Sequence, residues 1–277
     1  MIELTNEGVR KSVVGFLEGA GLPIRDRLFR AMASWSEFAL FGGFIREVHL
    51  FGRTADFRDI DVVVPGTSMN RFAKKVQAFA PEINRFGGAK FRSEGLLVDA
   101  WPLGFTWAFR EGLLEPSYAN LAKSTFLNVD AIVADLSRTG RVRIFDEGYL
   151  DGLRDRTLRI NLRPNPVPFH SASKAIVFAA RSGFQIDEGL TEYIAGLARQ
   201  HRGATQIWGA TSDQYGCGFI PRTQINKWLE QIVFSASKSM PCQLSVGKGD
   251  VVAEHTTVKR FRTDRKLLLQ RLGHTGA

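Results

Sequence analysis

Leu40-Phe41-Gly42-Gly43-Phe44-Ile45-Arg46-Glu47 and, thirteen residues after Arg46, Asp59-Ile60-Asp61-Val62-Val63-Val64 are the stretches that decide the fold. The first is a short apolar run that ends at a glycine pair, after which apolar residues recur at helical spacing as far as Leu50. The second is a β-branched run closed by Pro65-Gly66, which predicts a strand over 60–64. A glycine turn that opens a helix is thus followed by a strand that carries two aspartates.

Asp59 and Asp61 are predicted to lie side by side, because residues i and i+2 of a strand point to the same face. Two carboxylates at that separation repel each other unless a cation lies between them. Mg²⁺ suits the position, since it takes one or two carboxylates and completes its coordination with water and phosphate oxygens. The spacing predicts that Asp59 and Asp61 bind metal, with Mn²⁺ as a substitute for Mg²⁺.

Gly42 and Gly43 stand where the backbone can approach a phosphate group. Glycine accepts the turn conformation, and the N-terminus of the helix that follows favours negative charge. Arg46 lies one turn later and is expected to reach the same phosphate. We therefore expect Gly42, Gly43 and Arg46 to bind the triphosphate of a nucleotide.

A third acid, Asp99, lies within Leu96-Leu97-Val98-Asp99-Ala100-Trp101, a predicted apolar strand. A lone carboxylate in such a strand is costly unless it is paired or bound to metal. Beside the first strand, Asp99 would complete the three carboxylates that two-metal nucleotidyl transfer uses. Asp59, Asp61 and Asp99 are the predicted catalytic and metal-binding residues.

Each of these features also has a purely structural interpretation. Asp59 would then cap a turn, and Asp61 would pair with a basic residue such as Arg53 or Arg58. The glycine pair would be a tight turn, and Asp99 would belong to a structural ion pair. Two roles are open for Glu47. It would either pair with Arg46 or support the site through a residue that contacts the substrate.

These residues resemble the head domain of bacterial-type poly(A) polymerases and CCA-adding tRNA nucleotidyltransferases, within the polymerase-β-like superfamily. That family has Gly-Gly-x-x-Arg-Asp and then Asp-x-Asp on a strand; Gly42-Gly43-Phe44-Ile45-Arg46-Glu47 and Asp59-Ile60-Asp61 match, with Glu47 for the final Asp. Further similar stretches are Phe126-Leu127-Asn128, Ile144 to Gly148, Leu158 to Ile160 and Lys174 to Phe184, so the similarity covers about residues 36 to 187. The resemblance implies an α+β fold, with a small mixed sheet flanked by helices and then a helical domain.

The chain departs from that family where the family reads the nucleotide. Ala122-Lys123-Ser124 replaces the Arg-Arg-Asp used around the sugar, and Pro168 and Ser171 replace the Asp and Arg that read the base. These departures argue against CCA addition itself and leave the metal and triphosphate chemistry unaffected. The motifs also resemble nucleotidyltransferase toxins of the same superfamily, whose acceptor is a tRNA end or a protein hydroxyl.

The order of patterns along the chain predicts two domains, 1–163 and 164–277. Arg163-Pro164-Asn165-Pro166-Val167-Pro168 separates them, because proline continues neither a helix nor a sheet. Before it we expect helices over 9–33 and 68–80, and strands over 89–92, 96–101 and 142–145. After it we expect helices over 171–183, 188–199 and 222–237, with the glycine-rich stretch 203–218 as a surface loop.

Charge and composition limit the functional classes. Lys and Arg number 37 against 28 Asp and Glu, a net charge of +9 that favours a polyanionic partner or simple solubility. A basic segment near the end of the chain, with Lys259, Arg260, Arg262 and Arg265, is expected to bind nucleic acid or to be a solvated helix. No apolar run approaches a membrane span and no signal pattern opens the chain, so a cytoplasmic protein is expected. Cys217 and Cys242 are expected to be free thiols.

The sequence therefore predicts a Mg²⁺-dependent nucleotidyltransferase that transfers NMP from an NTP such as ATP to an acceptor hydroxyl and releases pyrophosphate. RNA, such as a tRNA end, is the expected acceptor, and a protein or a small molecule stays open as an alternative. Lys174 and Arg181 are seven residues apart and therefore lie on one face of a helix. They are further candidates for phosphate binding, and the alternative is that this face is only solvated. The rival hypotheses are a toxin-like enzyme acting on tRNA or protein, and a non-catalytic RNA-binding module that keeps the head fold.

Overall fold

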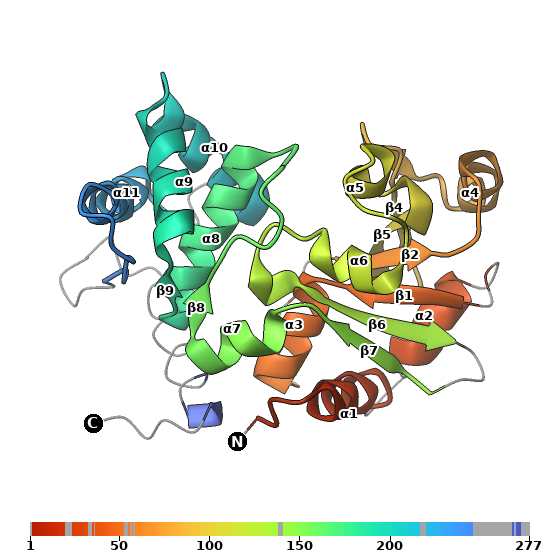
Figure 1. The fold of residues 1–277 in the computed structure, drawn as a ribbon. Helices are drawn as coiled ribbons and strands as arrows, with labels where there is room; N and C mark the ends of the chain where they lie inside the picture. The colour runs from red at the N-terminus through yellow and green to blue at the C-terminus, as the bar shows by residue number, and fades with distance from the viewer. Residues whose placement is uncertain are drawn as a thin grey trace. The chain divides into compact units, whose positions relative to one another are not determined.

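The chain divides into two units in the computed structural model (Figure 1). Residues 2–125 and 129–150 form the first unit, and residues 126–128 with the chain from 151 onward form the second. The structure describes residues 2–19, 24–32, 35, 37–52, 55, 57, 59–137, 141–216, 220–245, 268 and 270–272. No described helix is long and apolar enough to cross a membrane.

A seven-stranded mixed sheet forms the centre of the first unit (Figure 1). Its order is β3-β4-β5-β2-β1-β6-β7, with the bounds Glu82–Ile83, Ala89–Ser93, Leu96–Pro102, Ile60–Val64, Glu37–Phe41, Ile132–Ser137 and Arg143–Asp146. Only the β2–β5 pair is parallel among the pairs in this sheet. The expected α+β class with a small mixed sheet is confirmed.

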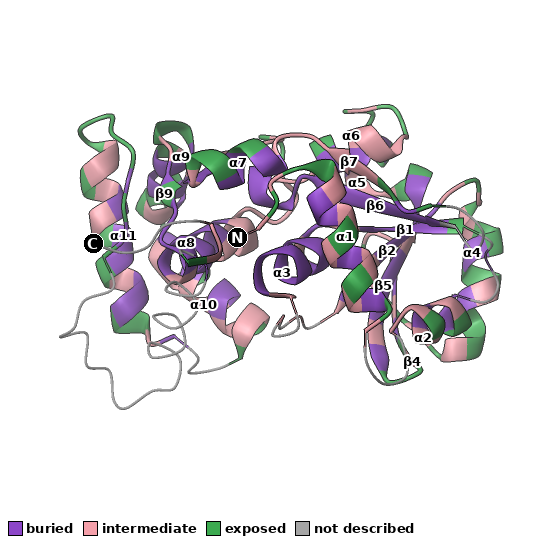
Figure 2. Cartoon of the chain, turned by 90° about the horizontal axis from the view of Figure 1, so that it is seen from below, coloured by how far each residue is buried: buried purple, intermediate pink, exposed green. Residues whose placement is uncertain are grey.

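Helices cover both faces of this sheet. They are α1 (Asn6–Leu17), α2 (Ile24–Ala31), α3 (Gly43–Phe51), α4 (Met69–Val76), α5 (Trp107–Arg110) and α6 (Tyr118–Lys123), with 3-10 turns at Gln77–Phe79, Leu103–Phe105 and Asn128–Asp130. On one face, Phe109 and Leu121 of α5 and α6 pack with Ala39, Val63 and Val133 of the strands. Helices α1 and α3 lie on the other side (Figure 1). Helix α3 is buried from Phe44 to Phe51 (Figure 2), so its polar side chains need partners inside the unit.

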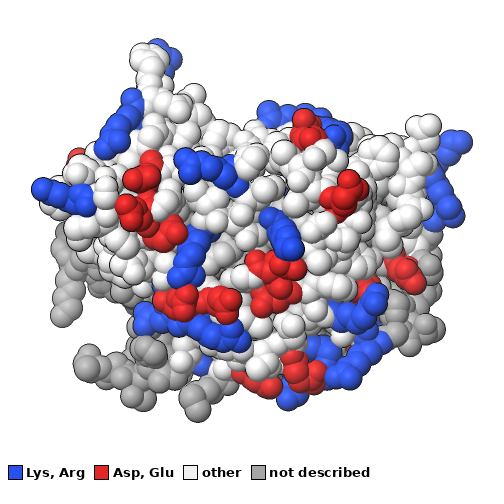
Figure 3. All heavy atoms as spheres, viewed as in Figure 1, with Lys and Arg blue, Asp and Glu red and all other residues white. Residues whose placement is uncertain are grey.

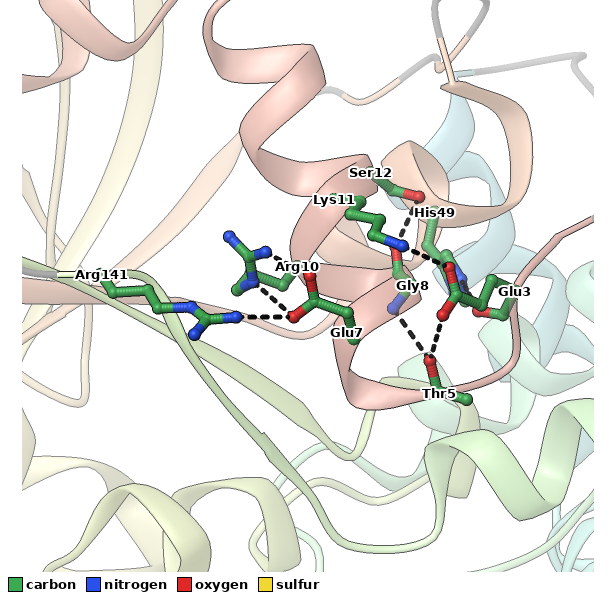
Figure 4. A network of polar contacts seen from close by, with 9 residues as sticks. All are labelled: Glu3, Thr5, Glu7, Gly8, Arg10, Lys11, Ser12, His49 and Arg141. Carbon is green, nitrogen blue, oxygen red and sulfur yellow. Dashed lines mark hydrogen bonds and ion pairs between the residues drawn. The ribbon is translucent and has the colours of Figure 1, made fainter.

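A polar network at the surface fastens the first helix (Figure 4). Thr5 caps α1, since its Oγ1 accepts a hydrogen bond from the Gly8 amide at 3.0 Å. Glu7 accepts hydrogen bonds from Arg10 and, at 3.0 Å, from Arg141 beyond β6. The bond from Arg10 lowers the pKa of Glu7 to about 2. The network therefore ties the start of the chain to residues far along it.

The second unit is mainly helical. Its helices are α7 (Tyr149–Asp155, which begins in the first unit), α8 (Pro168–Ser182), α9 (Glu188–Arg199), α10 (Gly203–Tyr215) and α11 (Arg222–Ala236). The helices expected over 171–183, 188–199 and 222–237 are thus confirmed. A two-stranded parallel sheet of β8 (Thr157–Leu158) and β9 (Gln185–Ile186) accompanies them, which the sequence analysis did not anticipate.

The loop expected over 203–218 was wrong, because residues Gly203–Tyr215 form helix α10. Ile207, Ala210 and Thr211 are buried at helical spacing, and this apolar stripe outweighs the low helix propensity of glycine. Gly203 is required by close packing, since a Cβ there would lie 1.9 Å from the Leu197 carbonyl oxygen. Gly203 therefore allows close packing at the start of a helix and does not indicate a loop.

The proline-rich stretch 163–168 lies inside the second unit, which also includes residues 151–163. Pro168 is the first residue of α8, where a missing amide hydrogen breaks no helical hydrogen bond. Residues 126–128 join this unit through Asn128, whose Nδ2 donates to the Thr157 carbonyl at 2.9 Å and whose Oδ1 accepts from the Arg159 amide at 2.9 Å. Cys242 is a buried free thiol, and Cys217 lies outside the described residues.

Candidate functional site

Asp61 and Asp99 lie directly beside each other on parallel strands. The β2–β5 register pairs Asp61 with Asp99 and Val63 with Trp101. Neighbouring strands are about 4.8 Å apart, and paired residues point to the same face. Asp59 precedes β2 by one residue and has the same parity as Asp61. We call Asp59, Asp61 and Asp99 the acid row.

Two members of the acid row are largely removed from water. The side chain of Asp59 is 15% exposed and that of Asp99 is 13% exposed. Apolar residues alternate with the acids, since Ile60 and Val62 on β2 and Val98 and Ala100 on β5 are all buried. The alternating apolar residues thus anchor each strand through one face, and the carboxylates lie on the other.

A lysine bridges two of these carboxylates. Lys90 on β4 is the register partner of Asp99. Its Nζ donates to Asp59 Oδ2 at 2.7 Å and lies 3.1 Å from Asp99 Oδ2. Burial lowers the pKa of Lys90, but the hydrogen bond to Asp59 and the charges of both acids outweigh burial and hold it above its ordinary value. The ammonium group is therefore held charged between the two carboxylates.

The sequence predicted metal ions at the acid row, and the structure brings its three acids together. Among the described residues, no group of three or more His, Cys, Asp and Glu side chains is arranged to hold a metal ion. Lys90 contacts an oxygen of Asp59 and an oxygen of Asp99. Asp99 therefore belongs to an ion pair, as its purely structural interpretation predicted. Arg53 and Arg58, considered as partners of the acids, lie outside the described residues.

The glycine turn opens α3 at the sheet end where the acid row lies. Strand β1 ends at Phe41, and continuing the β1–β2 register by one residue places Phe41 opposite Asp61. Gly42 has φ 68° and ψ −132°, a conformation that glycine adopts without strain, and its amide donates to the Ile132 carbonyl at 3.0 Å. A Cβ on Gly42 would meet no atom within 4 Å in the described part of the chain, so the turn faces open space.

Arg46 belongs to a buried ion-pair network. Its side chain is 9% exposed, Nη1 donates to Asp130, and Nη2 lies 3.2 Å from Glu47 Oε1. Glu47 is thus a partner of Arg46, as one of the two interpretations predicted. The guanidinium also lies against the glycine turn, because Nη2 would be 3.6 Å from a Cβ on Gly43. Direct contact between Arg46 and a phosphate stays a prediction.

The positions that depart from the resembled family have local roles in the fold. Ala122 lies on α6 and is buried in the core. Lys123 Nζ lies 3.5 Å from Glu147 Oε2, and the Ser124 hydroxyl donates to the Leu121 carbonyl at 2.7 Å. Each of these three residues therefore has a contact within the first unit.

The remaining predicted residues lie elsewhere. Lys174 and Arg181 are on α8 of the second unit, two turns apart and half-buried. Lys259, Arg260, Arg262 and Arg265 lie outside the described residues. On the face shown in Figure 3, basic and acidic side chains are interspersed rather than gathered in one basic patch. Nucleic-acid binding by these residues stays a prediction.

Sequence reasoning missed Lys90 and Asp130. Lys90 lies between Ala89 and Phe91, both buried, so its alternation places it on the face opposite to them. That pattern alone does not show that the face is shared with Asp99, because only the strand register makes them neighbours. Asp130 is 84 residues from Arg46 along the chain and carries no motif.

Comparison with known proteins shows the fold. No family model and no curated protein sequence matches the chain. A CCA-adding enzyme in complex with ATP matches 82% of this chain and 55% of its own length, with 17% identity and a TM-score of 0.56. An apo tRNA-processing enzyme matches 80% and 59%, with 17% identity and a TM-score of 0.53. A tRNA nucleotidyltransferase with a primer tRNA and an incoming ATP analog matches 75% and 60%, with 17% identity and a TM-score of 0.51. The chain spans less than two thirds of the length of these structures and shares their fold.

Proposed function

We propose that the protein is a nucleotidyltransferase that moves a nucleoside monophosphate from an NTP to a hydroxyl group of RNA and releases pyrophosphate. The observation that carries the proposal is the in-register pair of Asp61 and Asp99, with Asp59 beside them, at the sheet end where Gly42 and Gly43 open a helix. The fold shared with CCA-adding enzymes supports it.

The acid row consists of three carboxylates, and carboxylate oxygens are ligands that Mg²⁺ prefers. Bound Mg²⁺ would stabilise the negative charge that develops on the transferring phosphate and on the leaving pyrophosphate. Asp59, Asp61 and Asp99 would hold it. Lys90 contacts two of these acids in the structure.

The protein's own groups would carry the remaining steps. Backbone amides of the first turn of α3, after Gly42, would hold the triphosphate against the helix N-terminus. Asp99 would accept the proton of the acceptor hydroxyl as its oxygen forms a bond to the α-phosphorus. The bond from the α-phosphorus to the β-phosphate oxygen then breaks, and pyrophosphate leaves with the electron pair.

RNA is the proposed acceptor because of charge. The chain carries a net charge of +9, and a polyanion gains affinity from such an excess. Lys259, Arg260, Arg262 and Arg265, with Lys174 and Arg181, are the proposed contacts to RNA and nucleotide phosphates. With NTP and RNA as substrates, the cytoplasm is the proposed compartment of the reaction.

The test is transfer of labelled nucleotide from each NTP in turn, with Mg²⁺ and total RNA as acceptor. We expect the wild type to label RNA and the Asp59→Ala, Asp61→Ala double variant to leave it unlabelled. Asp151→Ala, an exposed aspartate of α7, serves as the control and should label RNA as the wild type does. Wild-type labelling no greater than that of the double variant rejects the enzymatic proposal.

A non-catalytic RNA-binding module is the second candidate. The Lys90 ammonium within the acid row and the altered sugar-reading positions, Ala122 to Ser124, favour it. RNA binding without nucleotide transfer would select this candidate. A label that appears on added protein rather than on RNA would instead select the toxin-like enzyme.

A further inference from the structure

We infer that Lys90 is a resident cation of the acid row and takes the place of one of the two divalent ions that such a set of carboxylates would otherwise hold. The inference rests on the proposed function, since it treats the acid row as the site where metal and nucleotide meet. Lys90 is then a positioning residue, because it acts through Asp59 and Asp99.

Lys90 lies between two carboxylates of the acid row. The Lys90 Nζ lies 2.7 Å from Asp59 Oδ2 and 3.1 Å from Asp99 Oδ2. Lys90 and Asp99 are register partners on the neighbouring strands β4 and β5, and Asp59 directly precedes β2. A divalent ion that bridges the two acids through these same oxygens would occupy the position of the ammonium group. One oxygen cannot accept the ammonium hydrogen bond and also form a short metal bond along the same direction.

The charges of the acid row and Lys90 favour a single divalent ion. The three carboxylates of the acid row and the Lys90 ammonium group together sum to two negative charges. One divalent ion balances them, whereas two such ions beside Lys90 would leave an excess of two positive charges before a nucleotide arrives. Since the side chains of Asp59 and Asp99 are mostly shielded from solvent, that excess would be poorly screened.

The position of Lys90 is set by its strand. Ala89 and Phe91 anchor β4 through buried side chains, so Lys90 is fixed on the other face of the sheet. Its register partner is Asp99 itself. A strand-borne lysine is held more precisely than one on a loop, and this position suits a group that stands in for an ion.

The test counts ions. Mn²⁺ bound per chain is measured by electron paramagnetic resonance with a non-hydrolysable NTP analogue, for the wild type, Lys90→Met, Lys90→Arg and Lys74→Met. We expect Lys90→Met to bind one more Mn²⁺ than the wild type, because the methionine side chain frees the two oxygens. Lys90→Arg keeps the cation and should match the wild type. Lys74→Met, at an exposed lysine of α4, is the matched control and should also match it.

Equal ion counts for the wild type and Lys90→Met overturn the inference. A purely structural lysine would lower stability on substitution and leave the number of bound ions the same. A Lys90→Arg variant that binds a different number of Mn²⁺ ions from the wild type would also contradict the proposed role of the lysine as a cation.

A second measurement uses only the wild type, so it holds if Lys90→Met does not fold. Lysines are acetylated with acetic anhydride, and the labelling of Lys90 is followed by mass spectrometry with and without Mn²⁺ and the NTP analogue. We expect Lys90 to react more slowly than Lys74 and to keep its low rate when the ions are added. A rise in the Lys90 rate on adding ions shows that metal displaces the ammonium, which overturns the inference.

The ion count and the transfer assay separate the two proposals. An extra ion in Lys90→Met together with no wild-type transfer keeps the inference and rejects the enzymatic function. Nucleotide transfer by the wild type together with equal ion counts for the wild type and Lys90→Met supports the enzymatic function and rejects the inference about Lys90.

Discussion

Asp61 on β2 and Asp99 on β5 are register partners in the single parallel strand pair of the first unit's described sheet. Their positions are 38 residues apart in the sequence, and the crossover between them contains α4 and the β3–β4 hairpin. A parallel pair brings the same ends of two strands together, so both carboxylates reach the sheet end at which α3 begins. The proposed chemistry depends on this relationship.

Asp99→Asn removes the proposed proton acceptor and one metal ligand while keeping the size of the side chain. We expect nucleotide transfer to fall by about 100-fold or more, the loss typical when a group that stabilises developing charge is removed. Circular dichroism and a thermal melt should show a folded protein. Asp151→Asn on the exposed face of α7 is the control, and equal activity of the two variants would contradict the role of Asp99.

Arg46→Met should lower the free energy of unfolding by about 3 to 5 kcal/mol, because it leaves two buried acids without their cation. Asp130 and Glu47 have side chains 7% and 5% exposed and both contact Arg46. Urea denaturation measures the change. Arg154→Met removes an exposed pair with Asp151 and should cost less than about 1 kcal/mol. Similar losses in the two variants would show that burial of the Arg46 network contributes little.

Gly42→Ala should lower the free energy of unfolding by about 1 to 3 kcal/mol, since a side chain at φ 68° and ψ −132° is strained. The space around Gly42 is open, so the loss comes from the backbone and not from a clash. Gly43→Ala is the matched control, because its Cβ would make ordinary contact with Arg46 Nη2 at 3.6 Å. Chemical denaturation of both variants measures the difference, and an equal effect at the two positions would argue against backbone strain.

Tyr118→Phe should leave the free energy of unfolding unchanged or raise it by up to about 1 kcal/mol. The Tyr118 hydroxyl is buried and has no hydrogen-bond partner within the described residues, and an unsatisfied buried group of this kind is destabilising. Burial and the charges of Asp135 and Glu37 raise the pKa of this tyrosine, so it stays neutral. Urea denaturation at pH 7 checks the prediction. A loss above about 1 kcal/mol would reveal a partner for the hydroxyl.

Neutralising Lys259, Arg260, Arg262 and Arg265 should weaken RNA binding and flatten its dependence on salt. The slope of log K against log[salt] should fall by roughly one unit for each phosphate that the variant no longer neutralises. Fluorescence anisotropy over a salt series measures the slope. An unchanged slope would assign these four charges to solubility.

The parts of the fold that were predictable from the sequence have strong periodic patterns. Residues 60–64 form β2 as expected, since its four β-branched residues, Ile60 and Val62 to Val64, are all buried and include neighbours that point to opposite faces of the sheet. Helix α9 occupies 188–199 as expected, with Asp187 capping it by accepting from the Leu190 amide at 2.8 Å. In both elements local preference and tertiary packing favour the same structure.

Strand β6 was not predicted, although it lies between β1 and β7 in the sheet. Asp135 interrupts its apolar run at a buried position, where a charge argues against a core strand. In the structure, Asp135 is paired with Arg143, its register partner on β7, whose Nε donates to Asp135 Oδ2 at 2.9 Å. The partner that makes the acid tolerable lies eight residues away on another strand, so no local pattern reveals it.

The sequence by itself determined which residues carry the candidate chemistry, because the parity of Asp59 and Asp61 and the freedom of Gly42 are properties of a few consecutive residues. Only the tertiary structure decided what surrounds them. It placed Asp99 beside Asp61, buried Arg46 against Asp130 and set the Lys90 ammonium between Asp59 and Asp99. The physical reason is strand register. Shifting one strand by a single residue turns its side chains to the other face, and the whole packed sheet, not any local preference, selects among the registers.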